Sequence, residues 1–319
     1  MCLFVAKLLA GFLMDFHKIK FILNPRAGRK GIRRKILATV NKILASSTLA
    51  YHIELTQCKG DGTRIAREAL AEGYDLMVAI GGDGTINEVA SALIHTPTLL
   101  GIIPTGSGNA LAHELGLPMH ISGAVRLITE KKGRVKELDV GWLPDLSAGP
   151  AQAGRYFLST LGIGYDAYVA KLFNEYGKER RGLLPYFYLA LKAFLQYRPQ
   201  LITLKFQGQD IRDTFFLVAV ANIKQYGGGA IIAPQASPYD ALLDICLIRQ
   251  VKFWQFLYHW PKLFTGTIDK VAFLETCRTP TLEISLPPNT PYQLDGESFS
   301  DTSILSVSVL PRALKLYAP

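Results

Sequence analysis

A glycine-rich pentapeptide carrying one carboxylate is the first candidate site in the chain. Gly81-Gly82-Asp83-Gly84-Thr85 directly follows the short apolar run 75–80. Its three glycines let the backbone approach a ligand closely, and the free amides at the start of a following helix attract anions. Asp83 would repel a polyphosphate unless a cation lay between them, so we expect a magnesium-bound nucleotide. The alternative is that GGDGT is only a tight turn.

The residues around this loop predict the elements that position it. The run 75–80 is typical of a strand buried on both faces of a parallel sheet. Apolar residues then recur with the spacing of one helix face: Ile86, Val89, Ala90 and Leu93. Thr85 and Glu88 have the spacing of a capping box, which predicts that their side chains fix the start of this helix.

A second glycine loop follows the next predicted strand, 99–103. Its small and polar residues are Gly106, Ser107, Gly108 and Asn109, and a short helix to Leu115 is expected after them. Loops that follow successive parallel strands lie at the same carboxyl edge of the sheet, where open α/β sheets bind ligands. Neither loop is a Walker A motif, and no complete GxGxxG occurs, so ordinary P-loop and dinucleotide-binding chemistry are disfavoured.

The N-terminal strand and helix carry charge of one sign. Between Phe16 and Ile53 there is no acidic residue, whereas nine residues are basic: Lys18, Lys20, Arg26, Arg29, Lys30, Arg33, Arg34, Lys35 and Lys42. This cluster spans a predicted strand at 18–23 and the turn 24–28, and it suggests a group of cations that binds phosphate. The alternative is a solvated basic helix face.

Composition limits the remaining classes. With 319 residues and 49% hydrophobic content, the chain is expected to form two domains, and no apolar run reaches the roughly 18 residues that a membrane-spanning helix requires. The net charge of +9 suits an anionic partner. Four scattered cysteines fit a reducing cytosol, and the six histidines lack metal-site spacing. Nucleic-acid binding is disfavoured because the basic cluster lacks interleaved aromatic residues.

Two apolar segments need a separate interpretation. Residues 1–15 form an apolar N-terminal extension, for which we favour an interfacial helix, or a true start at Met14, over a secretory signal. Residues 183–197 are apolar nearly all round and predict a helix that either belongs to the core or lines an apolar binding site. A second helix is predicted at 165–176.

The second half of the chain predicts an antiparallel β-sandwich. Strand-like runs become frequent after about residue 136 and the alternation of strands with helices fades. The predicted strands are 136–142, 156–163, 201–206, 215–222, 242–248, 281–286 and 304–310.

The ordered set of motifs resembles the diacylglycerol kinase catalytic-domain family, which includes soluble bacterial lipid kinases and the sphingosine and ceramide kinases. The resemblance covers the chain from about Lys18 to its end. The motifs that carry it are NPRAG at 24–28, GGDGTINEV at 81–89, PTGSGNALA at 104–112, LGIGYD at 161–166, QYGGG at 225–229, DALLD at 240–244 and LDGE at 294–297.

The resemblance implies an α/β, Rossmann-like nucleotide-binding domain with a parallel sheet, facing a β-sandwich domain that binds the lipid. On this basis we expect the first domain at 16–139 with 306–319, and the second at 140–305. The implied reaction transfers the γ-phosphoryl group of ATP, with Mg²⁺, to a lipid hydroxyl. The implied setting is cytoplasmic and peripherally associated with a membrane.

The family pattern also implies roles for individual residues. Asp295 is the expected general base with Glu297 beside it, although Asp83 is a second candidate and geometry must decide between them. Asp166 is expected to bind substrate, and Asp240 with Asp244 to hold a structural magnesium ion. The residues expected to bind ATP are Asn24, Arg29, Arg33, Arg34, Gly81, Gly82, Asp83, Gly84, Thr85, Glu88, Gly106, Ser107, Gly108 and Asn109.

Two departures from the family pattern leave questions open. Ala110 stands where many bacterial diacylglycerol kinases have an acidic residue, and Ala241 replaces the glycine of the D-G-x-L-D element. The lipid therefore stays open between a diacylglycerol, a sphingoid base, phosphatidylglycerol and another lipid alcohol. Two other functions also stay open, an NAD kinase-like nucleotide kinase and a non-catalytic lipid-binding protein, and the sequence does not decide between a monomer and a homodimer.

Overall fold

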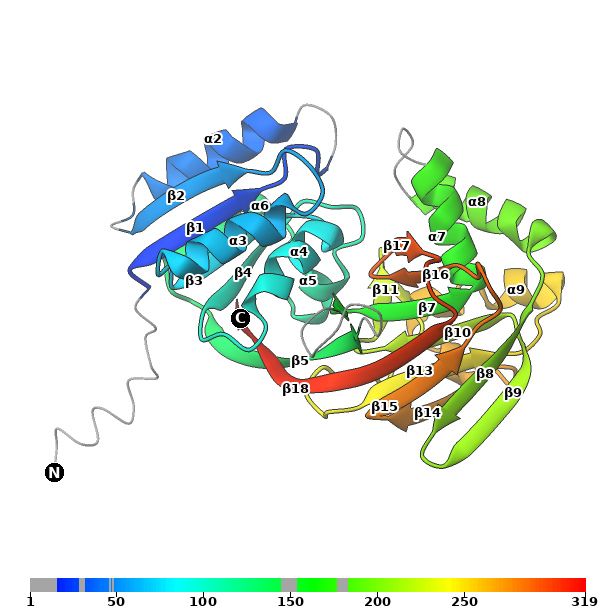
Figure 1. Ribbon diagram of the computed structural model, residues 1–319. Coiled ribbons are helices and arrows are strands. Elements are labelled where there is room, and N and C mark those ends of the chain that lie inside the picture. The colour runs from blue at the N-terminus through cyan, green and yellow to red at the C-terminus, as the bar shows by residue number, and fades with distance from the viewer. Residues whose placement is uncertain (1–15, 29–31, 46, 48, 145–153, 177–182) are drawn as a thin grey trace, which may run out of the picture.

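The computed structural model describes residues 16–28, 32–45, 47, 49–144, 154–176 and 183–319. An N-terminal α/β half and a C-terminal sandwich half lie side by side, and one long strand runs along the base of both (Figure 1). This is the architecture that the sequence predicts, and it is confirmed. None of the helices in the described ranges is both long and apolar enough to cross a membrane.

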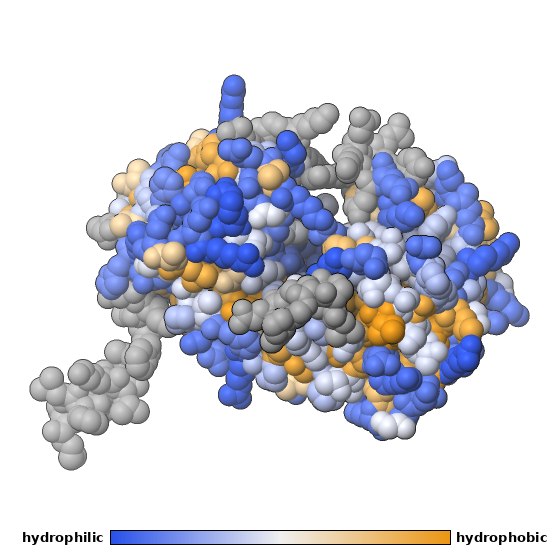
Figure 2. Space-filling view, viewed as in Figure 1, coloured by the Kyte–Doolittle hydropathy of each residue, from blue (hydrophilic) through white to orange (hydrophobic). Residues whose placement is uncertain are grey.

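The N-terminal half is a parallel sheet with helices on both faces. Its elements are β1 (Lys18–Leu23), α2 (Ile32–Leu44), β2 (Ala50–Leu55), α3 (Asp61–Ala71), β3 (Leu76–Gly81), α4 (Asp83–Leu93), β4 (Leu99–Pro104), α5 (Ala110–Glu114) and α6 (Ile121–Thr129). The strands pair in the order β2-β1-β3-β4, all in parallel. β3 and β4 are buried along their whole length because helices cover both faces, which explains their uninterrupted apolar sequences. Hydrophilic side chains dominate the outer surface over α3 (Figure 2).

The C-terminal half packs two antiparallel layers against each other. Its strands are β5 (Arg134–Pro144), β6 (Gly154–Phe157), β7 (Thr160–Gly164), β8 (Gln200–Phe206), β9 (Gln209–Phe215), β10 (Leu217–Ala221), β11 (Gln225–Gly227), β12 (Ala230–Ile231), β13 (Leu243–Ile248), β14 (Glu275–Thr279), β15 (Thr281–Ser285), β16 (Tyr292–Leu294), β17 (Glu297–Phe299) and β18 (Ile304–Ala318). One layer continues the N-terminal sheet through β18-β15-β8-β9, and the other has the order β14-β13-β10-β7-β16-β17. Alternating side chains of both layers form the core between them.

Helices cover the outer face of the second layer. They are α7 (Tyr165–Tyr176), α8 (Leu183–Gln196), α9 (Phe253–His259), α10 (Lys262–Thr265) and the 3₁₀ helix η1 (Ile268–Lys270). The first two match the predicted helices, whereas the sequence interpretation missed α9 and α10. These two are short, and Pro261 lies between them, so neither shows a long helical repeat.

β18 joins the two halves. Leu305, Val307 and Val309 pack into the sandwich core, while Leu314 and Leu316 pack into the N-terminal core. The register of β18 against β5 shifts between Leu310 and Leu314, where Arg312 takes a positive φ of 50°. The predicted domain boundary at residue 306 stays a prediction, and the change of core occurs across this bulge.

One predicted strand is wrong in its extent. Residues 156–163 form two strands in different layers, β6 and β7, instead of one. The chain bends at Leu158 and Ser159, whose backbone amides both donate to the carboxylate of Asp295. A contact from 137 residues away therefore ends the first strand, and the alternating pattern of the sequence cannot show it.

Candidate active site

The first glycine loop connects β3 to α4 as predicted, but its side chains are used differently. The predicted capping box is wrong, since Gly82 occupies the N-cap of α4 and has no side chain to cap it. Glu88 instead accepts hydrogen bonds from the amides of Gly60 (2.9 Å) and Gly62 (2.9 Å), at the start of α3. Thr85 accepts one from Asn24 Nδ2 (2.9 Å). The first amides of α4 therefore have no side-chain cap from Gly82 and face the loop.

The second glycine loop packs directly on the first. Thr105 N donates to Gly81 O (2.8 Å), and a Cβ placed on Gly106 would lie only 2.5 Å from the Cα of Gly82. Glycine is required at this crossing because any side chain would separate the two loops. The adjacency predicted for the two loops is thus present in the structure.

Asp83 fastens the two loops together. Its Oδ2 accepts a hydrogen bond from Asn109 N (2.8 Å) and its Oδ1 accepts one from Ala110 N (2.7 Å), the first residue of α5. A carboxylate at a helix N-terminus is favoured by the amides exposed there. Consequently the amide of Asn109, which we expected to bind phosphate, is already engaged by Asp83. Each oxygen of Asp83 keeps capacity to accept a further hydrogen bond.

Asp295 is held by four donors at the junction of the two halves. Its Oδ1 accepts from the amides of Ser159 (2.8 Å) and Thr160 (3.0 Å). Its Oδ2 accepts from the amide of Leu158 (2.8 Å) and from Asn87 Nδ2 (2.8 Å). Two hydrogen bonds per oxygen use most of the acceptor capacity of this carboxylate.

Asn87 is a positioning residue that the sequence interpretation did not select. Its Nδ2 donates both to Asp295 and to Tyr156 O (2.9 Å), so this residue of α4 connects the N-terminal half to two segments of the sandwich. It belongs to the GGDGTINEV motif, where it is the only amide side chain. That position in the motif was the available signal.

Asp166 lies in the first turn of α7, facing the same cavity. Gln293 Nε2 lies 3.4 Å from its Oδ2, and the Tyr226 hydroxyl is a neighbour of this carboxylate. Its Oδ1 is a buried oxygen with no hydrogen bond of normal geometry in the described part of the chain. A Cβ on Gly162 would lie 1.7 Å from Oδ2, so β7 must carry glycine there to admit the carboxylate. Burial raises the pKa of Asp166 to about 7, although the Tyr226 hydroxyl lowers it. This carboxylate therefore suits a ligand that donates a hydrogen bond.

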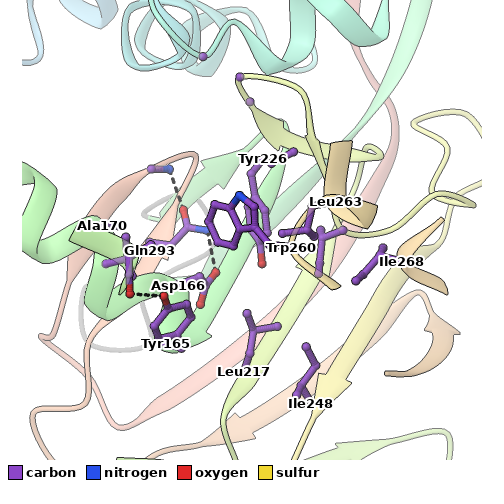
Figure 3. A pocket seen from close by; sticks show the side chains of 18 of the residues that line it. Tyr165, Asp166, Ala170, Leu217, Tyr226, Ile248, Trp260, Leu263, Ile268 and Gln293 are labelled. Carbon is purple, nitrogen blue, oxygen red and sulfur yellow. Dashed lines mark hydrogen bonds between the residues drawn. The ribbon is translucent and has the colours of Figure 1, made fainter. Parts of the chain in front are cut away.

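A single cavity of about 490 Å³ joins these groups. Both halves of the molecule contribute polar side chains to its lining, among them Asp83, Ser107, Asp166, Tyr226, His259, Gln293 and Asp295. The rest of the lining is predominantly apolar and comes from α7 to α10 and the strands beneath them. Figure 3 shows Asp166 and Gln293 on one side, with Leu217, Ile248 and Ile268 on the other.

Two carboxylates in this cavity influence each other. Burial, and next the negative charge of Asp295, raise the pKa of Asp83 to about 6. Burial also raises the pKa of Asp295, against the opposing effect of its hydrogen bonds. The pKa of Asp83 therefore lies close to neutral pH, where a general base is most effective.

Other predicted residues lie elsewhere. Glu297 forms an ion pair with Lys59 between the two halves and is not among the residues that line the cavity. Arg34 is exposed on α2, Arg29 lies outside the described residues, and the side chain of Arg33 is likewise outside them. Two members of the basic cluster have structural partners: Lys20 pairs with Glu54 (2.5 Å), and Lys18 donates to Glu72 O (2.7 Å).

The predicted metal element is a strand end with a strained turn. Asp244 is buried in β13, its Oδ1 accepts from Arg278 Nε (3.1 Å), and its Oδ2 has no partner among the described residues. Asp240 Oδ1 accepts a hydrogen bond from the amide of Leu242 (3.1 Å). The described ranges contain no cluster of three or more acidic, histidine or cysteine side chains suited to a metal ion. The magnesium site at Asp240 and Asp244 stays a prediction.

Ala241 offers a direct test of strain in this turn. Its φ is 58°, in the left-handed region, and its amide donates to Asp139 Oδ2 (2.7 Å). We expect Ala241→Gly to stabilise the protein by about 1 kcal/mol, because a side chain in this region costs about 1–2 kcal/mol and the more flexible unfolded glycine offsets part of that gain. Urea denaturation measures the change, with Ala71→Gly on the exposed end of α3 as a control that should destabilise. An unchanged or lower stability of Ala241→Gly would contradict the assignment of strain.

Comparisons with known proteins agree with this arrangement. Residues 18–143 match the family model of the diacylglycerol kinase catalytic domain, and residues 159–318 match the model of the YegS C-terminal NAD kinase beta sandwich-like domain. A Pectobacterium atrosepticum protein named "Probable lipid kinase YegS-like" is 31% identical over 93% of this chain and 95% of its own length. A Bacillus subtilis protein named "Diacylglycerol kinase" is 29% identical over 88% and 89%.

Solved structures share the fold. A structure from Bacillus anthracis superposes with a TM-score of 0.75 at 25% identity, covering 96% of this chain and 98% of that one. A yeast NADH kinase structure has a TM-score of 0.53 at 11% identity, covering 95% and 83%, and shows a likeness of fold alone. The chain therefore belongs to the lipid kinase family whose members combine a diacylglycerol kinase catalytic domain with a YegS C-terminal domain.

Proposed function

We propose that the protein transfers the γ-phosphoryl group of ATP to the hydroxyl group of a lipid. The observation that carries the proposal is the shared cavity, which has glycine-loop residues and three carboxylates at one end and a mainly apolar lining from α7 to α10 at the other. A nucleotide acceptor has no use for such a lining, whereas acyl or alkyl chains do. This contrast favours a lipid over NAD as the acceptor.

The nucleotide phosphates are assigned to the glycine loops. The N-terminus of α4 has glycine at its N-cap and carries the positive end of the helix dipole, so its amides suit a phosphate group. Magnesium usually keeps several waters and takes phosphate oxygens directly, so Asp83, the carboxylate that lies at both loops, would face the ion through one of those waters and keep its oxygens free to accept a proton. When bound, the ion neutralises charge on the phosphates.

Asp83 is the better general base of the two candidates. Both of its oxygens can accept another hydrogen bond, whereas Asp295 already accepts four. In the proposed step the lipid oxygen forms a bond to the γ-phosphorus, the bond from that phosphorus to the bridging oxygen of ADP breaks, and the hydroxyl proton passes to Asp83. Asp295 positions the strand junction and raises the pKa of Asp83 by its charge.

The lipid enters from a membrane in this proposal. In this proposal the protein is cytoplasmic and has to bind the membrane surface without spanning it. Its positive net charge favours binding to an anionic bilayer. Asp166 would contact the polar head of the lipid, since it has an acceptor oxygen without a partner among the described residues. A hydroxyl or an ammonium group of that head would donate a hydrogen bond to this oxygen.

Narrowing the apolar end of the cavity tests the proposal. Ala170 lines the cavity from α7, and Ala170→Phe places a ring in the space assigned to the lipid chain. We expect kcat/KM for long-chain lipids to fall about tenfold or more, because misfit in an apolar pocket costs about 1–3 kcal/mol, while a short-chain analogue is affected much less. The measurement is ADP release with lipids of graded chain length.

The matched control is Ala71→Phe, which adds the same ring to an exposed position on α3. Its kinetics should equal those of the wild type for every chain length. If Ala170→Phe reduced turnover of long and short lipids equally, or left both unchanged, the apolar end of the cavity would not be the site of the lipid chain.

A further inference from the structure

The outer side of α8 and α9 exposes an unusual concentration of large apolar side chains. Six of the eleven large hydrophobic residues that are exposed in the described part of the chain lie on these two helices. They are Tyr188 (65% exposed), Leu195 (66%), Phe253 (40%), Trp254 (61%), Leu257 (41%) and Tyr258 (71%), and together they are called here the α8–α9 face. Scattered single apolar residues are normal on a surface, but a contiguous group marks an interaction site.

The two helices are held together as one surface. Their inward rings pack in register, with Phe187 5.1 Å from Trp260 and Phe194 4.8 Å from Phe256 between ring centroids. Both helices lie on the C-terminal half, on the side away from the N-terminal sheet (Figure 1). The exposed rings are therefore presented by a packed pair of helices.

The same helices bound the cavity on their inner side. Ala190 of α8, Phe256 of α9 and Trp260, the residue that follows α9, line it. The members of the α8–α9 face alternate with these residues at helical spacing. The apolar end of the cavity and the exposed apolar surface are thus separated by the thickness of one helix layer. A core helix needs only one apolar face, so the second one requires a different explanation.

The chain segments that carry this face have charges of one sign. Residues 183–209 and 245–268 contain no Asp or Glu, and both segments carry lysine and arginine. Lys192 and Lys252 are exposed beside the aromatic residues, as is Arg198 after the end of α8. Arg249 pairs with Asp213 (2.6 Å) and also with Glu275, so it is not counted as part of the face.

We propose that the α8–α9 face docks on the surface of an anionic lipid bilayer and delivers the lipid to the cavity. Exposed Trp and Tyr side chains suit the headgroup level of a bilayer, and neighbouring lysines add attraction to anionic lipids. A second copy of the chain fits less well, because two such faces would bring like charges together. The delivery of substrate rests on the proposed function, whereas the docking itself does not.

Vesicle binding without nucleotide tests the docking. The full-length protein is sedimented with vesicles of phosphatidylcholine containing about 30% phosphatidylglycerol. We expect the double variant Trp254→Ser/Tyr258→Ser to bind these vesicles at least about tenfold more weakly than the wild type. The control Leu201→Ser/Tyr239→Ser changes two exposed apolar residues outside the face, and should bind as the wild type does.

A second experiment tests the contribution of the lysines to docking. Lys192→Gln/Lys252→Gln should weaken binding to the phosphatidylglycerol vesicles several-fold and leave the weaker binding to pure phosphatidylcholine unchanged. Vesicle binding by Trp254→Ser/Tyr258→Ser equal to that of the wild type would overturn the proposal. So would a change in the oligomeric state of this variant, measured by light scattering, together with undiminished vesicle binding.

Turnover of a dispersed short-chain lipid separates this proposal from the proposed function. Trp254 and Tyr258 do not line the cavity, so the variant that loses vesicle binding should keep the wild-type rate on this substrate. If the wild type phosphorylates no lipid but binds vesicles through this face, the proposed function fails and the docking surface stands.

Discussion

Asp83→Asn should lower kcat for lipid phosphorylation about 10³-fold, because a positioned general base contributes about 10²- to 10⁴-fold. The raised pKa of Asp83, about 6, gives this prediction a pH signature. Only the ionised carboxylate can accept the hydroxyl proton, so kcat/KM of the wild type should rise with pH through about 6 and level off above it. The residual activity of Asp83→Asn should lack this acid limb.

Loss of structure is the competing explanation for an inactive variant. Asp83→Asn keeps one acceptor oxygen but replaces the other with an amide that cannot accept from Asn109 or Ala110, so a stability loss of about 1–2 kcal/mol is expected. Circular dichroism and Tm establish that the variant is folded, and the exposed Asp210→Asn serves as the charge-matched control. A folded Asp83→Asn with a normal rate and an unchanged acid limb would exclude Asp83 as the base.

Asp166→Asn should stabilise the protein and impair its function at the same time. The pKa of Asp166 is about 7 in the folded protein, compared with 3.8 for an unperturbed aspartate, so the folded state disfavours the ionised form. Stability is therefore lost as the pH rises from about 4 to 7. Neutral asparagine removes this penalty, and the gain should be about 4 kcal/mol at pH 8.5 and less than half of that at pH 5.

Urea denaturation at the two pH values measures this gain, and a lipid titration measures its cost. The KM for the lipid should rise because the acceptor that faces the cavity becomes weaker. Asp213→Asn is the control of opposite sign, since the amide of Thr214 and next Arg249 lower the pKa of Asp213, which stabilises the folded protein above its ordinary pKa. An equal change in stability at pH 5 and pH 8.5 for Asp166→Asn would show that its ionisation is not the cause.

The elements that follow local rules were predictable from the sequence. β3 and β4 are apolar runs followed at once by glycine loops, and α7 and α8 are largely apolar segments of helix length, so their positions follow from local sequence. The meeting of the two loops was also predictable, because successive parallel strands end at the same edge. The polar strand β9 was missed because its sequence, QDIRDTF, lies at an exposed edge of the sheet.

The partners of individual side chains were not predictable. The sequence places Glu88 at capping-box distance from Thr85. In the structure its carboxylate instead accepts hydrogen bonds at the start of α3, a helix that lies near α4 only because the sheet has folded. Asp139 belongs to none of the motifs in the sequence. It is buried and accepts hydrogen bonds from the backbone amides of Ala241 and Arg312, residues more than 70 positions apart. Such contacts depend on tertiary packing, which periodicity does not encode.

The most direct test of the proposed reaction follows the terminal phosphate of ATP. Wild type and Asp83→Asn are incubated with Mg²⁺, ATP labelled at the γ-phosphate, NAD, and vesicles carrying diacylglycerol, a sphingoid base and phosphatidylglycerol, and the labelled products are identified by mass spectrometry. We predict label in a lipid phosphate, formed about 10³-fold more slowly by Asp83→Asn than by the wild type. Label that appears in NADP alone, or in a lipid product formed equally by both proteins, would contradict the account.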